Sequence, residues 1–210
     1  MTNGRDAPAK VPAGRLPTPL IPAARLQQAL HSPPVLVKRD DLTGFALAGN
    51  KARKLEFLTG DALVTGGGPG SNHCQATAAA ARVAHLACHL VMYGNEPARP
   101  HPNLAFARCA GTEVTVTGQA DRGSVDPALA ETAGRLTAAG HRPYVIPRGG
   151  ATAVGAAGCG LAVAELAGQL ASLGIEPEFV VVATGSCGTQ AGLLAGTAAG
   201  TIPGGSSGPR

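Results

Sequence analysis

The sequence predicts an α/β fold built around a parallel sheet. Short apolar or β-branched segments alternate with helical segments through the middle of the chain. The expected strands are residues 62–65, 86–93, 113–117 and 143–146, and the expected helices between them are 72–84, 102–110 and 127–139. Strands joined by a helix at this spacing pair in parallel through right-handed crossovers. With 44% hydrophobic residues, the chain has enough apolar side chains for a globular core.

Segments on either side of this alternation complete the expected element order. Residues 1–14 are rich in proline, glycine and charge, and we expect them to form a flexible tail. A short amphipathic helix is expected at 23–30, followed by a strand at 35–39. After the alternation come a helix near 161–173 and the most strongly apolar strand of the chain, 179–183.

The end of the sequence is unusual for such a fold. Residues 201–210 are rich in glycine, serine and proline, and we expect a disordered tail. A sheet that stops one helix after its best strand is unfinished. The sequence therefore predicts that the domain containing 179–183 is incomplete.

Composition excludes several classes of function. The net charge is +4 with dispersed basic residues, and only 3% of residues are aromatic, which argues against a nucleic-acid surface. No apolar run reaches the ~18 residues that span a bilayer, and residues 1–12 lack the apolar core of a secretory signal. Five cysteines without regular spacing fit reduced thiols. We therefore expect a cytoplasmic protein with no membrane or nucleic-acid partner.

The stretch 49–56 is the most informative one for chemistry. The chain has four lysines against thirteen arginines, and Lys51 and Lys54 both fall within these eight residues. A lysine amine can lose its proton in a dry pocket and form a Schiff base, whereas a guanidinium stays charged. Asn50 is expected to cap a helix that carries both lysines and extends to Leu58. Lys51 is therefore the first candidate for covalent catalysis.

A glycine-rich turn at 184–189 follows the expected strand 179–183 and opens a helix. Such a turn gathers backbone N–H groups and the positive end of a helix dipole around an anion. Ser186 and Thr189 add hydroxyl donors, and the turn has no P-loop lysine, so one phosphate fits better than a Walker-type nucleotide site. The alternative is a tight strand–helix connection without a ligand.

A second glycine-rich turn, 65–73, has features both for and against a dinucleotide site. Gly66-x-Gly68-x-x-Ser71 approximates a dinucleotide fingerprint, and Glu96 lies near the position of a ribose-binding carboxylate. Against this, the third glycine is missing and Pro69 removes an amide that a pyrophosphate would use.

The polar residues Ser71, Asn72 and His73 stand at the start of the expected helix 72–84. They either cap that helix or contact the carboxylate and ring oxygen of a ligand. No G-x-S-x-G elbow surrounds Ser71, which argues against a hydrolase nucleophile. The nearby histidines and cysteines match no zinc spacing, so no metal site is expected.

Several motifs, in one order, resemble a known family. They are residues 16–20, 37–42, 49–56, 70–73, 146–150 and 185–193. The sequence resembles the pyridoxal-phosphate enzymes that group D-cysteine desulfhydrase with 1-aminocyclopropane-1-carboxylate deaminase, within the tryptophan-synthase β fold type, also called fold type II. The resemblance runs from about residue 16 to 196. It implies pyridoxal 5'-phosphate as cofactor, a small amino acid as substrate and a homodimer.

The resemblance also implies a role for each matching residue. Lys51 would form the internal aldimine and move protons, and Lys54 would approach the phosphate. Asn72 would hydrogen-bond the cofactor's ring hydroxyl, while Ser71 would meet the substrate carboxylate or transfer a proton, with His73 beside them in substrate binding. The residues expected to hold the phosphate are Gly185, Ser186, Cys187, Gly188 and Thr189.

The domain organisation follows from the same resemblance. Residues 15–52 together with 161–200 would form part of a large cofactor domain, and 53–160 a small α/β domain. The implied reaction is a β-elimination or ring opening, catalysed by a lyase or by a deaminase of the hydrolase type, with a 2-oxo acid and ammonia as products. Cys187 stands where the family's phosphate turn usually has glycine. The alternative function is a shortened, non-catalytic protein that at most binds the cofactor.

Overall fold

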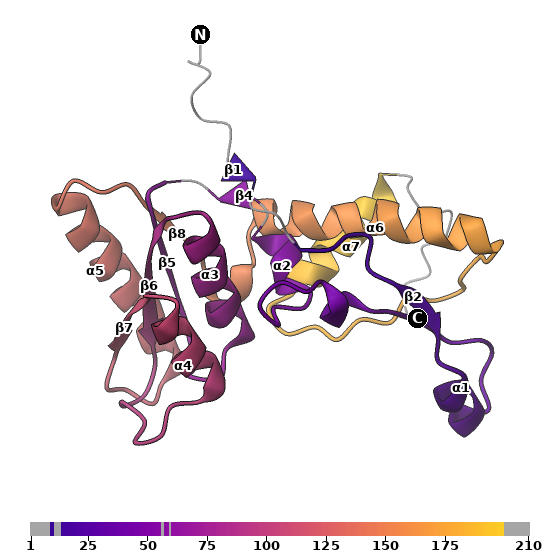
Figure 1. The fold of residues 1–210 in the computed structure, drawn as a ribbon, viewed down its shortest axis with the longest axis horizontal. Helices are drawn as coiled ribbons and strands as arrows, with labels where there is room; N and C mark the ends of the chain where they lie inside the picture. The colour runs from indigo at the N-terminus through magenta and orange to yellow at the C-terminus, as the bar shows by residue number, and fades with distance from the viewer. Residues whose placement is uncertain (1–8, 11–13, 56, 59, 200–210) are drawn as a thin grey trace, which may run out of the picture.

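The computed structural model describes residues 9–10, 14–55, 57–58 and 60–199, and its centre is a four-stranded parallel sheet (Figure 1). The strand order is β7-β6-β5-β8. The strands are β5 (Ala62–Gly67), β6 (Ala87–Met92), β7 (Glu113–Val116) and β8 (Pro143–Val145). All neighbouring pairs are parallel, which confirms the α/β class and the four strands expected in this region.

Helices cover both faces of this sheet (Figure 1). They are α3 (Asn72–Val83), α4 (Pro102–Cys109) and α5 (Val125–Ala138). The residue alternation along β5 explains the two layers: Leu63 packs with α3 and α4, whereas Ala62 and Val64 pack with α5. Each face is therefore buried, as expected for a parallel sheet.

A second group of elements lies beside the sheet and carries the longest helix (Figure 1). Strands β2 (Leu20–Pro22) and β3 (Leu36–Lys38) pair antiparallel, as do β1 (Ala9–Lys10) and β4 (Phe57–Leu58). The helices are α1 (Ala24–Leu30), α2 (Lys51–Lys54), α6 (Ala153–Leu173) and α7 (Gly188–Ala198). Short 3-10 turns are η1 (Asp40–Leu42), η2 (Arg122–Ser124) and η3 (Arg148–Gly150).

The predicted strand at 179–183 is wrong, because the structure gives these residues no regular secondary structure. Phe179 is 72% and Val181 95% exposed. A strand forms by hydrogen bonding to a neighbour, and among the described residues no strand is hydrogen-bonded to this segment. Its apolar sequence alone cannot supply that partner.

Two helix boundaries also differ from the predictions. Helix α6 begins at Ala153 rather than near residue 161, because the Thr152 side chain caps it by accepting a hydrogen bond from Gly155 N (3.0 Å). Helix α2 ends after four residues, at Lys54, and Leu58 lies in β4. The first two turns of α6 were missed because residues 153–160 are mostly alanine and glycine, which carry little periodic signal.

One segment, Arg148–Leu173, is long and apolar enough to cross a membrane, contrary to the expectation from the sequence. Within it, α6 packs against α2 and α7 and carries the charged Glu165 in a network of ion pairs. Only 33% of its apolar window is buried, and Leu161 and Leu173 are exposed. Most of the expected tail 1–14, and all of 201–210, lie outside the described residues. The expected domain boundaries at 53 and 160 stay a prediction.

Candidate functional site

Lys51 is the first residue of α2, at one end of the site. The expected cap by Asn50 is wrong, because Asn50 has helical φ and ψ of −61° and −12° and makes no side-chain cap. Its side chain instead reaches the first turn of α7, where Nδ2 donates to Thr189 Oγ1 at 3.0 Å. The residue before the candidate lysine is therefore tied directly to the start of α7, 139 residues away in the chain.

The turn that precedes α7 has the geometry of an anion site. Helix α7 is 11 residues long, so its first turn presents a positive dipole end, and the first of its N–H groups, that of Gly188, donates to Ser186 O at 2.8 Å. Cys187 stands at the N-cap with φ 59°, a left-handed conformation that costs a non-glycine residue about 1–2 kcal/mol. Ser186 lies beside Gly149, to whose carbonyl its hydroxyl donates at 3.4 Å.

Lys54 joins this turn from α2. Its Nζ donates to Gly149 O at 3.2 Å, and a Cβ built on Gly188 would lie 3.0 Å from the same nitrogen. Burial, followed by the nearby charge of Lys51, lowers the pKa of Lys54. Within the described residues no carboxylate pairs with either lysine.

Two neighbouring amines and a helix N-terminus without a counter-ion are well suited to a phosphate group. The lysines supply point charges, and the turn before α7 supplies N–H and hydroxyl donors. A second amine remains free to react with an aldehyde. These residues therefore fit a cofactor that combines an aldehyde with a phosphate.

Ser71 is the N-cap of α3, as the sequence allowed. Its Oγ accepts a hydrogen bond from Cys74 N at 3.2 Å. Asn72 is exposed, and its Oδ1 accepts from Asn103 Nδ2 at 2.8 Å, so its side chain is engaged by α4. Its expected contact with the cofactor ring stays a prediction.

His73 is 3% exposed and points into the protein. The Thr65 hydroxyl donates to Ile146 O (2.7 Å), so its oxygen is left to accept from His73 Nε2, 3.2 Å away. The imidazole therefore carries its proton on Nε2, and Nδ1 is a buried acceptor without a hydrogen-bond partner among the described residues. Burial, with the charges of Lys51 and Lys54, lowers the pKa of His73 to about 3.

A cleft of about 650 Å³ lies between the two glycine-rich turns. It brings together Ser71, Gly185 and Ser186 from the predicted site, whereas Lys51, Asn72 and His73 are not among its lining residues. Its full lining is residues 66–71 with Tyr93, Arg122, Arg148, Gly149, Ala151, Gly185 and Ser186. Lys54, Cys187, Gly188 and Thr189 are also absent from the lining, so the cleft meets the predicted phosphate site only at Gly185 and Ser186.

Three of the lining side chains, Tyr93, Arg122 and Arg148, had no role assigned to them from the sequence. Arg148 is fixed by a two-pronged ion pair with Asp126 (3.0 and 2.7 Å) and donates to Arg122 O at 3.0 Å. The available signals were weak: Arg148 follows an expected strand, and Tyr93 ends one. Both positions are carboxyl ends of parallel strands, where ligands bind in α/β folds.

No group of three or more histidine, cysteine, aspartate or glutamate side chains suited to a metal ion occurs in the part of the chain that the structure describes. His73 and Cys74, which adjoin on α3, are both buried.

Comparison with known proteins places these features in a family context. A family model described as pyridoxal-phosphate dependent enzyme matches residues 11–207. A protein of Pyrococcus abyssi, provisionally named 1-aminocyclopropane-1-carboxylate deaminase, is 42% identical over 171 residues, covering 78% of this chain and 51% of the relative. A D-cysteine desulfhydrase of Klebsiella pneumoniae is 39% identical over 196 residues, covering 86% of this chain and 57% of the relative.

A solved structure supports the same relationship at the level of the fold. The crystal structure of an ACC deaminase homologue superposes with a TM-score of 0.81 and 33% identity, covering 95% of this chain and 62% of that one. The chain thus spans little more than half the length of the curated relatives described above.

Proposed function

Because the chain belongs to the family of pyridoxal-phosphate-dependent enzymes, we propose that Lys51 and the turn before α7 bind pyridoxal 5'-phosphate for a lyase or deaminase reaction on a small amino acid. The observation that carries this proposal is the approach of Lys54 Nζ to Gly149 O and to Gly188, close enough to Lys51 for the two charges to interact. Among the described residues no carboxylate pairs with either amine. An anion with an attached aldehyde would satisfy both ends of that arrangement.

Each residue of the chain has a defined task in this proposal. Lys51 would hold the aldehyde end of the cofactor, and its amine would hold or move a proton at the substrate's α-carbon. Lys54 and the first amides of α7 bind the phosphate. The Ser71 hydroxyl, at the opposite side of the cleft, binds the substrate carboxylate. When bound, the cofactor supplies an electron sink for the negative charge at that carbon.

The substrate class that we propose is taken from the related proteins. A β-substituted alanine such as D-cysteine, with one water, would give pyruvate, ammonia and the protonated substituent. 1-Aminocyclopropane-1-carboxylate, with one water, would give 2-oxobutanoate and ammonia. The first reaction is that of a lyase and the second that of a hydrolase. The related proteins carry both names, so the two substrates should be assayed in parallel.

Borohydride trapping tests the cofactor site directly. The protein is incubated with pyridoxal 5'-phosphate, reduced, digested and mapped, and the reduced adduct should lie on Lys51. Lys51→Ala should abolish both the adduct and the visible absorption band, while the control Lys10→Ala should retain both. An adduct that survives in Lys51→Ala, or that maps to another lysine, would contradict the proposal.

A second function, cofactor binding without turnover, is favoured by one observation. Residues 179–183 form no strand in front of the turn that would hold the phosphate, so that turn lacks the sheet support typical of such sites. This function predicts a Lys51 adduct but no ammonia from either substrate. Measured ammonia release that depends on Lys51 would rule it out.

We also propose a cytoplasmic location and a homodimer. The five cysteines are all free thiols, as is usual in a reducing compartment. The exposed apolar side chains at 179–182 support self-association. Fractionation of the native host and sedimentation of the purified protein test the two statements separately.

A further inference from the structure

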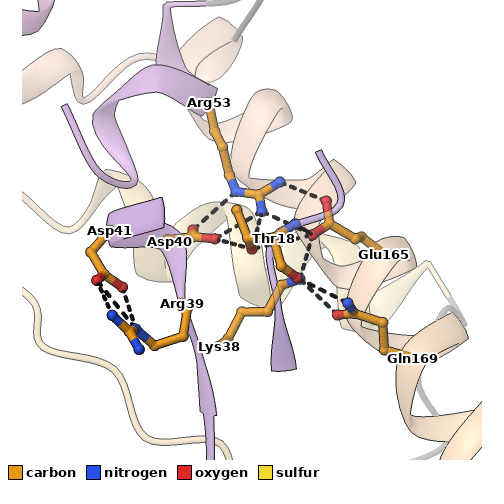
Figure 2. Close-up of polar contacts among 8 residues, drawn as sticks. All are labelled: Thr18, Lys38, Arg39, Asp40, Asp41, Arg53, Glu165 and Gln169. Atoms are coloured by element: carbon orange, nitrogen blue, oxygen red, sulfur yellow. Dashed lines mark hydrogen bonds and ion pairs between the residues drawn. The ribbon is translucent and has the colours of Figure 1, made fainter. Parts of the chain in front are cut away.

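A network of charged side chains joins η1, α2 and α6, two residues along the chain from Lys51 (Figure 2). Its centre is Arg53, whose side chain is 2% exposed. Nε and Nη2 of Arg53 donate to the two oxygens of Asp40 at 2.9 and 2.8 Å, while Nη1 and Nη2 donate to the two oxygens of Glu165 at 3.0 and 3.1 Å. One guanidinium thus binds two carboxylates, each through two hydrogen bonds.

Neighbouring groups complete the network (Figure 2). The Thr18 hydroxyl donates to Asp40 Oδ1 (2.8 Å), and Thr18 N donates to Glu165 Oε1 (2.7 Å). Lys38 Nζ also binds Glu165 and donates to Gln169 Oε1 at 2.7 Å. Burial alone would raise the pKa of Glu165, but hydrogen bonds from Arg53 and Lys38 lower it to about 2. Glu165 and Arg53, whose pKa is raised against the effect of burial by its hydrogen bonds to Asp40 and Glu165, are therefore both ionised at neutral pH.

Helix α2 cannot set the position of Lys51 without such an anchor. With four residues it is far below the length at which a helix is stable by itself. Lys51 is half-buried and lies two residues before Arg53. Fixing the guanidinium of Arg53 in a rigid fork therefore fixes the backbone that carries the amine.

The same network reaches the phosphate side of the site through α6. Glu165 lies on α6, and a Cβ built on Gly158 of that helix would collide with Arg53 O, so α2 and α6 are in direct backbone contact. Helix α7 packs on α6 as closely, since a Cβ on Gly192 would lie 2.6 Å from Cys159 Cβ. Helix α6 therefore sets the distance between the amine-bearing helix and the helix whose first turn faces Lys54.

We propose that Arg53, bound between Asp40 and Glu165, is a positioning residue that sets the span from the Lys51 amine to the turn before α7. This inference rests on the proposed function, since it concerns a ligand bound at both ends. The span matters only for a molecule that carries an aldehyde and a phosphate at a fixed separation. A molecule with the aldehyde alone needs only Lys51.

That difference provides a test. If Arg53 had a purely structural role, its substitution would not change the preference for the phosphorylated ligand. Dissociation constants for pyridoxal 5'-phosphate and for pyridoxal are measured from the visible band, and the ratio of the two is compared between variants. Arg53→Lys keeps the charge but loses the fork, and should reduce the preference for the phosphorylated ligand roughly tenfold or more, because misplacement by about 1 Å is costly for a two-point contact. Binding of pyridoxal should change little.

Matched variants keep this test decisive. Arg39→Lys removes a comparable two-pronged pair with Asp41 at the surface (2.9 and 2.7 Å) and should leave the ratio unchanged. Glu165→Gln is measured in parallel, in case Arg53→Lys does not fold, and should also lower the ratio. An unchanged ratio in folded Arg53→Lys or in Glu165→Gln would overturn the inference. If the wild-type protein forms no adduct at Lys51, the proposed function itself has failed.

Discussion

Ser71 shows how one residue can serve both the fold and the proposed chemistry. Its Oγ accepts the Cys74 N–H at the start of α3 and also faces the cleft. Both roles were considered from the sequence, and the structure establishes the capping role alone. Separating the two requires a substitution that preserves the cap and removes the hydroxyl.

Ser71→Ala should destabilise the protein by about 1 kcal/mol through loss of the cap and should abolish ammonia release. Ser71→Asp retains an acceptor oxygen at the N-cap, so we expect the melting temperature to recover while activity does not. Thermal unfolding and ammonia assays measure the two effects. Turnover in Ser71→Asp equal to that of wild type would show that the hydroxyl takes no part in the reaction.

His73 gives a prediction about acid stability. Its pKa is lowered to about 3 in the folded protein, mainly by burial, whereas an unfolded histidine titrates near 6.5. Between these values the unfolded state binds more protons, so stability falls as the pH is lowered. From pH 7.5 to pH 5 this one residue should reduce the free energy of unfolding by about 2 kcal/mol.

Urea unfolding of wild type and His73→Gln at both pH values isolates this contribution. The variant should lose about 2 kcal/mol less than wild type over the same interval. Equal losses in the two proteins would mean that His73 takes up its second ring proton as readily in the folded as in the unfolded state, and that burial does not lower its pKa.

At the scale of elements, two glycines of α6 have different surroundings, and one of them allows α2 to pack closely on this helix. Gly158 faces Arg53 O so closely that a methyl group cannot fit, whereas a Cβ added to Gly168, on the same helix, would have nothing within 4 Å. Helix propensity alone favours alanine at both places. The contact between α2 and α6 therefore distinguishes the two positions.

Gly158→Ala should cost about 1–3 kcal/mol or more, since backbone cannot move aside cheaply. The matched change Gly168→Ala should stabilise by about 0.5–1 kcal/mol. Urea denaturation at one pH gives both values. If Gly158→Ala were as stable as Gly168→Ala, the close packing of α2 on α6 would be wrong.

The whole molecule presents an apolar surface at residues 179–182, formed by the segment expected to be a strand. Val181 is almost completely exposed. Exposed apolar patches promote association, so Val181→Lys should lower concentration-dependent self-association without reducing the melting temperature. Ala171→Lys adds the same charge at an exposed position of α6 and serves as control.

Sedimentation velocity over a range of protein concentrations distinguishes these variants. Val181→Lys should shift the distribution toward the monomer, and Ala171→Lys should resemble wild type. Identical distributions for all three proteins would show that residues 179–182 do not mediate association.

The sequence by itself determined the parallel sheet, its three covering helices and the two glycine-rich turns. These features depend on alternation, periodicity and turn chemistry between residues close in the chain, and Ala62, Leu63 and Val64 already encode the two faces of β5. The two lysines, which are the first and last residues of α2, could be identified for the same reason.

Only the tertiary structure decided which distant groups meet. Asn50 binds Thr189 instead of capping α2, Arg53 gathers two carboxylates from separate elements, and residues 179–183 remain unpaired. Each outcome depends on at least one partner more than a hundred residues away, or on the absence of a neighbouring strand in the described chain. Local sequence carries no record of such partners, because hydrogen bonds and ion pairs are satisfied in space rather than along the chain.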